Sequence, residues 1–185
     1  MGNNLLVTLI SLGVGALLGG VVQALVGRYA AFKESKGMAV ALQAEINAII
    51  QIVGYRQYLT HLNQIIQTLQ NPAHQPTHQN VFSAKVEQNY FETFNSLSSK
   101  IGLLNSLSQD VVLFYTQAKA VLEDFHRLHE TYEQALRGQI TLNRVGLLNQ
   151  TQRLHDLVQI ALATGQRAAH DLNLHASRRW FCLLN

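Results

Sequence analysis

The stretch LLVTLISLGVGALLGGVVQALVG, residues 5–27, decides the architecture expected of this chain. It contains no charged side chain, and Gln23 is its one strongly polar residue. As an α-helix it would be about 34 Å long, which is enough to cross the hydrocarbon core of a bilayer, about 30 Å thick. A signal peptide has a shorter apolar part and a basic start, and this chain has neither. We therefore predict a transmembrane helix over residues 5–27, after a short tail at residues 1–4.

Basic residues on one side of this stretch indicate its orientation. Arg28, Lys33 and Lys36 follow it, whereas residues 1–4 carry no charged side chain. Because basic residues near a span favour the cytoplasmic side, we expect the N-terminus to face out. Residues 28–37 would then form a juxtamembrane segment, and the rest of the chain would lie in the cytoplasm.

The predicted membrane helix carries small residues at four-residue steps. They form two adjacent ridges, which are Ser11, Gly15 and Gly19, and Ala16, Gly20 and Ala24. Such ridges let a second helix approach closely, and close packing drives helix association in lipid. We expect this face to pack against another copy of the chain or against a different protein, although small residues are also common in membrane helices in general.

Beyond the juxtamembrane segment, apolar residues recur at steps of three and four and predict a helical bundle. One amphipathic helix is expected over residues 38–70. Both prolines of the chain lie in the loop that follows, and a shorter helix ending near Gly102 comes next. Ser106 and Gln109 have the spacing of a capping box, which predicts the start of a long helix that ends near Gly138.

The last helix shows the most regular pattern. Its apolar and small residues alternate between steps of four and three, as in a coiled-coil seam: Leu147, Thr151, Leu154, Val158, Ala161, Gly165, Ala168 and Leu172. The full prediction is an all-α protein with one N-terminal transmembrane helix and an antiparallel bundle of three long helices and one shorter helix at residues 38–176. Residues 177–185 would form an aromatic tail.

Charge is scarce in this chain and excludes one class of partner. Charged residues make up 14% of the sequence, against about 25% in a typical soluble domain. Of the net charge of +3, residues 1–36 contribute +2 from three basic residues and one acidic residue, which leaves 11 basic and 10 acidic residues in residues 37–185. That larger part has no clustered basic stripe, so we do not expect nucleic-acid binding.

The first helix of the bundle is the part most depleted in charge. Residues 37–84 contain only Glu45 and Arg56 as charged residues. Their outward positions are polar but uncharged, and we take them as a candidate partner face: Gln43, Asn47, Gln51, Gln57, His61 and Gln64. Charge depletion is typical of the centre of a protein interface. A general richness in glutamine explains the same pattern, and the sequence leaves both explanations open.

No motif in the sequence predicts catalysis or a bound metal. Glu123 and His126 have the Glu-x-x-His spacing of di-iron bundles, but no second copy of it occurs. His74 and His78 in the proline loop lack a third ligand, and the single Cys182 excludes an internal disulfide. A glycine-rich phosphate loop and a nucleophile elbow are also missing. We expect a non-enzymatic protein without cofactor or metal.

Several short stretches together resemble a group of bacterial single-pass membrane proteins of unknown activity. They are Gly19-Gly20 in the membrane helix, ALQAEI at residues 41–46, IGLL at 101–104, FY at 114–115 and VLED at 121–124. The likeness covers residues 10–125. It implies an inner-membrane location and a helical cytoplasmic domain, and it carries over no activity or site residue.

These patterns favour a membrane-anchored scaffold or accessory subunit that presents a helical bundle to a protein partner. One alternative is a self-assembling membrane effector, for example a stress, phage-defence or lytic component, in which the glycine-rich helices assemble. A second is a ligand-sensing bundle, with Tyr115, His126 and His129 as polar contacts.

Overall fold

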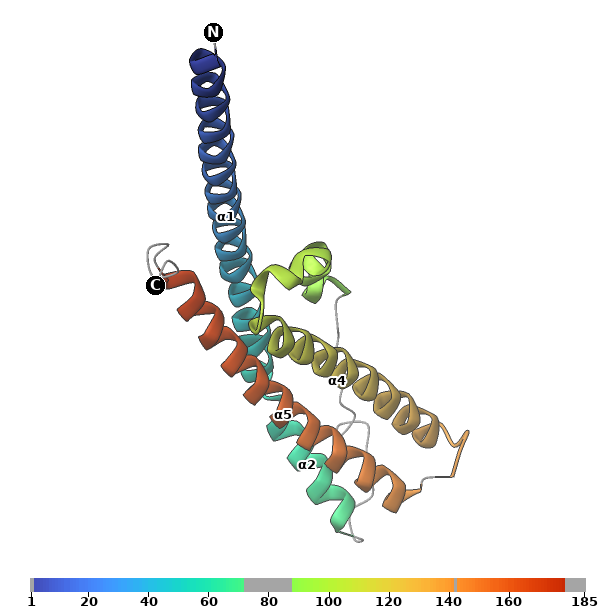
Figure 1. The fold of residues 1–185 in the computed structure, drawn as a ribbon. Helices are drawn as coiled ribbons and strands as arrows, with labels where there is room; N and C mark the ends of the chain where they lie inside the picture. Colours follow the sequence, from blue (N-terminus) through green and yellow to red (C-terminus); the bar gives the residue numbers. More distant parts are fainter. Residues whose placement is uncertain (1, 72–87, 142, 179–185) are drawn as a thin grey trace.

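The computed structural model describes the backbone of residues 2–71, 88–141 and 143–178, and the side chains of residues 19–71, 90–141 and 143–178. Within these ranges the chain is helical and has no strand. The elements are α1 (Gly2–Tyr55), α2 (Tyr58–Gln70), the 3-10 turn η2 (Gln88–Phe91), α3 (Glu92–Leu97), the 3-10 helix η3 (Ser98–Leu104), α4 (Leu107–Leu136) and α5 (Arg144–Ser177). The predicted fold class, an all-α bundle behind one long apolar N-terminal helix, is confirmed (Figure 1).

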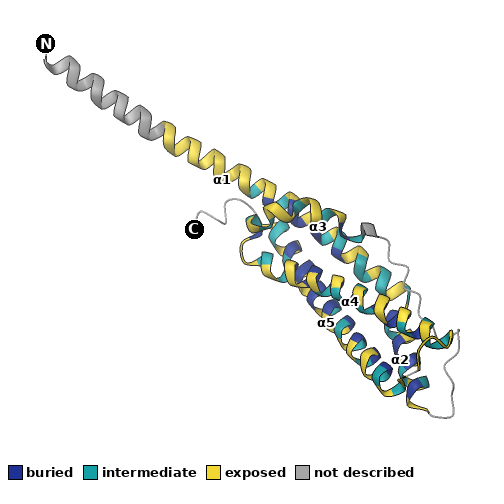
Figure 2. Cartoon of the chain, turned by 90° about the vertical axis from the view of Figure 1, so that its right-hand side faces the viewer, coloured by how far each residue is buried: buried dark blue, intermediate teal, exposed yellow. Residues whose placement is uncertain are grey.

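Helix α1 is a single element that joins the apolar stretch to the bundle. It spans 54 residues, which makes it about 80 Å long. Its N-terminal half projects away from the other helices, and its C-terminal half packs among them (Figures 1 and 2). Gly37 lies inside this helix without interrupting it. The juxtamembrane segment at residues 28–37 is therefore part of one continuous helix.

The prediction of one helix over residues 38–70 is wrong. A turn at Arg56 and Gln57 separates α1 from α2, and Gln57 adopts a left-handed backbone conformation with φ 51° and ψ 39°. The turn lets α2 change direction and bury one side, formed by Tyr58, Leu62, Ile65 and Leu69. Neither residue of the turn is glycine or proline, but Gly54 lies in the last turn of α1, and its carbonyl accepts the Gln57 amide at 3.1 Å.

Helix α5 is the central element of the bundle, because it packs against α1, α2 and α4. All eight positions of its predicted seam are buried. The small residue Gly165 allows the closest approach: a Cβ atom built there would lie 2.6 Å from Phe114 Cε2 and 3.3 Å from Ile50 Cδ1. Side chains of α4 and α1 therefore lie close to the second half of this helix.

Helix α4 begins and ends as predicted, but its first turn differs. Ser106 precedes the helix with helical dihedral angles and makes no side-chain capping bond, so the predicted capping box with Gln109 is not formed. At the other end, Gly138 has a φ of 70°. Its amide donates to Ala135 O, and the Gln139 amide donates to Gln134 O, which together form a Schellman motif.

The buried side chains form two clusters, one at each end of the bundle. The cluster nearer the apolar half of α1 includes Leu42, Phe114, Tyr115 and Leu172, with the short helices η2, α3 and η3 covering it. The other cluster joins α2 to the C-terminal half of α4 and the N-terminal half of α5. A cavity of about 60 Å³ with apolar walls separates the two clusters at the level where α1 ends.

Arg144, at the start of α5, holds the end of α2. Its guanidinium donates to Leu69 O at 2.6 Å, to Thr68 O at 2.6 Å and to Asn71 O. These carbonyls lie in the last turn of a helix, where backbone acceptors have no partner within the helix.

Replacing Arg144 with alanine is therefore expected to lower the free energy of unfolding by about 2 kcal/mol, since bonds from a charged donor are lost in a partly buried site. Arg153→Ala is the matched control, because Arg153 is an exposed residue of the same helix. Urea unfolding of the full-length chain in mild detergent measures both variants. Equal stability of the two would contradict the role of Arg144.

Candidate functional site

The apolar half of α1 is exposed to solvent along the part whose side chains are described. Every residue from Gly19 to Ala31 is exposed, and large apolar side chains are among them: Val21, Val22, Leu25, Val26 and Tyr29, which are 44–62% exposed. Among the described helices, α1 is long and apolar enough to cross a membrane. A helix of a soluble core would instead be covered by its own protein.

The predicted small-residue ridges fall partly within the described side chains. A Cβ atom added at Gly19 or at Gly20 would meet no atom within 4 Å, and Ala24 is exposed. This part of the ridges is open to another helix. Ser11, Gly15 and Ala16 lie outside the residues whose side chains are described.

The half of α1 inside the bundle leaves one side uncovered, which we call the outer face. Its exposed residues recur at steps of three and four and carry no charge: Val40, Ala44, Asn47, Ala48, Gln51 and Tyr55. Tyr55 is 91% exposed and Val40 54%. The side chains of Val40 and Tyr55 are thus exposed to solvent on an uncharged surface.

The predicted partner face maps onto three separate places. Asn47 and Gln51 belong to the outer face, and Gln43 is half-buried beside it. Gln57 forms the turn after α1, whereas His61 and Gln64 are exposed on α2. The turn therefore divides a face that a single helix would have kept continuous.

The two charged residues of this region explain why the outer face has none. Glu45 turns inward: its Oε1 accepts the Thr93 amide at 2.7 Å, and its Oε2 accepts the Phe94 amide at 3.1 Å and the Tyr115 hydroxyl at 2.5 Å. Burial, with the bond to Glu45 and its charge, raises the pKa of Tyr115 far above its ordinary value. Arg56 donates to Tyr58 Oη at 3.1 Å.

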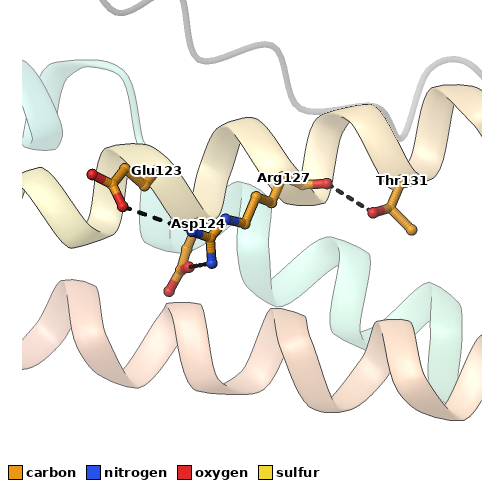
Figure 3. Close-up of polar contacts among 4 residues, drawn as sticks. All are labelled: Glu123, Asp124, Arg127 and Thr131. Carbon is orange, nitrogen blue, oxygen red and sulfur yellow. Dashed lines mark hydrogen bonds and ion pairs between the residues drawn. The ribbon is translucent and has the colours of Figure 1, made fainter.

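The exposed side of α4 provides a contrast (Figure 3). Arg127 lies 3.9 Å from a carboxylate oxygen of Glu123 and 3.9 Å from one of Asp124, and Thr131 Oγ1 donates to Arg127 O at 2.8 Å. His126 pairs with Glu130 at 3.1 Å. Pairs one turn apart on a solvated helix are ordinary surface. Helix α4 thus has a charged surface, and the outer face of α1 does not.

The motifs weighed and rejected as metal sites do not converge in the part of the chain that is described. Glu123 faces Arg127 and not His126, so the Glu-x-x-His pair does not point at one centre. No group of three or more His, Cys, Asp or Glu residues that could hold a metal ion occurs among the described residues. His74, His78 and Cys182 lie outside them.

Comparisons with known proteins leave the geometry as the main guide to function. No family model, curated protein or solved structure matches this chain.

The polar residues suggested for ligand sensing do not share a pocket. Tyr115 lies in the core with its hydroxyl on Glu45, and His126 is exposed. His129 has a buried Nδ1 without a hydrogen-bond partner. None of these three lines the apolar cavity between the clusters.

Sequence reasoning missed a polar junction where α1 enters the bundle. Ser35 is 3% exposed, and its Oγ donates to Leu103 O at 3.0 Å. The Oγ also lies 2.8 Å from His175 Nε2, so the ring nitrogen must be the donor. Lys36 Nζ donates to Arg178 O at 2.9 Å. An isolated serine and a distant histidine give no signal of this pairing in the sequence.

The junction predicts a pH dependence of stability. Burial, followed by the charges of Arg178 and Lys36, lowers the pKa of His175 below its ordinary 6.5. Below pH 6.5 the unfolded chain therefore binds more protons than the folded one, so this stability is complete above pH 6.5 and is lost as the pH falls through the lowered pKa. Between pH 7 and pH 5, we expect the melting temperature to fall less in His175→Gln than in the wild type. His170→Gln, at an exposed position of the same helix, should keep the wild-type dependence.

Proposed function

We propose that this chain is a single-pass protein of a bacterial inner membrane, with the N-terminus out and the bundle in the cytoplasm. The bare apolar half of α1 supports the span, because an apolar helix surface exposed on all sides is stable only in lipid or under a partner. Arg28, Lys33 and Lys36, which follow it, support the orientation. The bacterial location rests on the resemblance described above.

We further propose that the bundle is a non-catalytic scaffold or accessory subunit that binds a protein partner through the outer face of α1. The observation that carries this proposal is the uncharged outer face itself, with Tyr55 91% exposed. Exposed aromatic residues without neighbouring charge are typical of interface centres. Overall composition explains the absence of charged residues from the outer face less well, because α4 has a charged surface and the depletion is local.

A photo-reactive side chain at Gln51 tests this assignment inside intact cells. The same side chain at Gln166 is the matched control, because that residue is an exposed glutamine on α5. We expect a cross-link from position 51 to one protein of defined mass in the membrane fraction, and none from position 166. Equal cross-linking at both positions, or none at position 51, would contradict the outer face as a partner surface.

The open surface at Gly19 and Gly20 favours one second candidate, self-assembly of the membrane helix. Two differently tagged copies distinguish it from the first. If the two tagged copies co-purify, and Gly19→Ile together with Gly20→Ile abolishes their co-purification, the self-assembling effector becomes the favoured function. If the tags do not co-purify, the small-residue ridge does not join copies of this chain.

A further inference from the structure

The largest groove described on the molecule lies where α1 leaves the bundle. It has a volume of about 550 Å³ and is bounded by α1, by the turn between η3 and α4, and by the end of α5. Leu25, Leu103 and Leu174 give it apolar walls, and Arg28, His175 and Arg178 line it as well. The groove therefore combines apolar and cationic surface.

Its place along α1 fits the boundary of a membrane. Leu25 belongs to the apolar stretch, and Arg28 is the first charged residue after that stretch. The two residues are one helical turn apart, a rise of about 5 Å. The groove thus reaches from the depth of lipid chains to the depth of headgroups, and this position rests on the span proposed above.

The charges in the groove favour an anion. The side chains of Arg28 and Arg178 make no hydrogen bond or ion pair with the described part of the chain, and both are exposed. Asp171 is the one acidic residue among the lining residues, so the two arginines leave an excess of one positive charge. Burial lowers the pKa of His175 most, and the charges of Arg178 and Lys36 lower it further, which agrees with a positive potential at this point.

We propose that this groove binds an anionic phospholipid, with Arg28 and Arg178 on the headgroup phosphate and the leucine side chains against the first part of its acyl chains. Arginine suits phosphate because its planar fork donates two bonds at once. Basic pockets beside membrane helices on the cytoplasmic side recognise anionic headgroups in this way. The apolar walls favour a lipid over a free phosphate ion.

Native mass spectrometry of the full-length protein tests the proposal. The chain is placed in bilayer discs that contain equal amounts of phosphatidylglycerol and phosphatidylcholine, and the lipids retained by the released protein are counted. We expect the wild type to retain phosphatidylglycerol in preference. Since both arginines would hold the headgroup phosphate through charge-assisted bonds, R28Q/R178Q should lose most of that preference.

Two variants separate the groove from general attraction to the surface. K33Q/R167Q removes the same charge from the same two helices at exposed residues outside the groove, and it should keep the preference. R28K/R178K keeps the charge and should keep part of it. Circular dichroism checks that all variants fold.

Each result has a definite meaning. Equal retention of both lipids by the wild type, or equal losses in R28Q/R178Q and K33Q/R167Q, overturns the groove as a lipid site. Displacement of the lipid by inorganic phosphate or glycerol 3-phosphate at millimolar concentration overturns it in favour of a soluble anion. A chain that does not enter the discs removes the membrane span and this inference together, whereas a chain that enters them without lipid preference removes only the inference.

Discussion

Replacing Gly165 with leucine is expected to lower the free energy of unfolding by about 3 kcal/mol, because an over-packed core must shift its neighbours. A first carbon atom on residue 165 would already lie 2.6 Å from Cε2 and 2.8 Å from Cδ2 of Phe114. That ring is 2% exposed, so it can move only by displacing other core side chains or by entering the small cavity that it lines between the two clusters. Urea unfolding of the full-length chain in mild detergent, followed by circular dichroism, measures the loss.

Gly37→Leu is the matched control for Gly165→Leu. Gly37 also lies inside a long helix, but a Cβ atom there would meet no atom within 4 Å. Because glycine is about 1 kcal/mol less favourable than leucine or alanine in a helix, this variant should gain stability. Phe114→Ala should make Gly165→Leu less harmful by providing space. A loss of similar size at both glycines would show that crowding against Phe114 is not the cause.

Glu45→Ala is expected to give the second large effect, a loss of about 3 kcal/mol. The carboxylate accepts three bonds, from two amides at the start of α3 and from the Tyr115 hydroxyl. Tyr115 has no exposed surface, so its hydroxyl would remain buried without a partner, which costs about 1–3 kcal/mol. The stacked contact between Phe94 and Tyr115, with centroids 4.0 Å apart, should loosen as α3 detaches.

A double-mutant cycle tests that explanation of Glu45. In a Tyr115→Phe background the buried hydroxyl is absent, so Glu45→Ala should cost about 1 kcal/mol less than in the wild type. Glu92→Ala provides a control on α3 itself, because Glu92 is exposed and its removal should change stability little. Additive losses in the cycle would show that the carboxylate does not act through Tyr115.

In α5 the sequence carries a long regular period, and the structure follows it. The seam of α5 repeats over eight positions, and a small residue in that repeat predicts a close neighbour because only a short side chain leaves room for one. The end of α4 could also be predicted, because Gly138 adopts the left-handed conformation that glycine tolerates best. These features depend on local chemistry, which the sequence contains in full.

Features that depend on contacts between residues far apart in the sequence could not be predicted in this way. Gln57 adopts a left-handed backbone conformation, which residues other than glycine rarely adopt. The change of direction at this residue lets α2 bury Tyr58 and Leu62. The pairing of Ser35 with His175 joins residues 140 positions apart. Tertiary packing decides such contacts.

The uncharged outer face of α1 was predicted only in part for a related reason. Its glutamine and asparagine residues indicate a polar side of the helix, but the sequence alone suggests that Val40 and Tyr55 are core residues. Their exposure becomes visible only once α5 and α3 are seen to cover the opposite side of α1. Charge depletion indicates the uncharged side of α1, and the exposure of its individual residues required the structure.

Because α1 is one continuous helix, a tilt of its apolar half also moves the half that is packed in the bundle. No hinge separates its bare apolar half from the half packed in the bundle. Beyond Arg28, the helix rises about 40 Å to Tyr55, so a helix tilt of about 20°, ordinary in bilayers, would carry Tyr55 sideways by about 14 Å. With α1 across a membrane, the thickness of the bilayer sets the tilt of the helix, and thereby how far to the side of its entry point the exposed tyrosine lies.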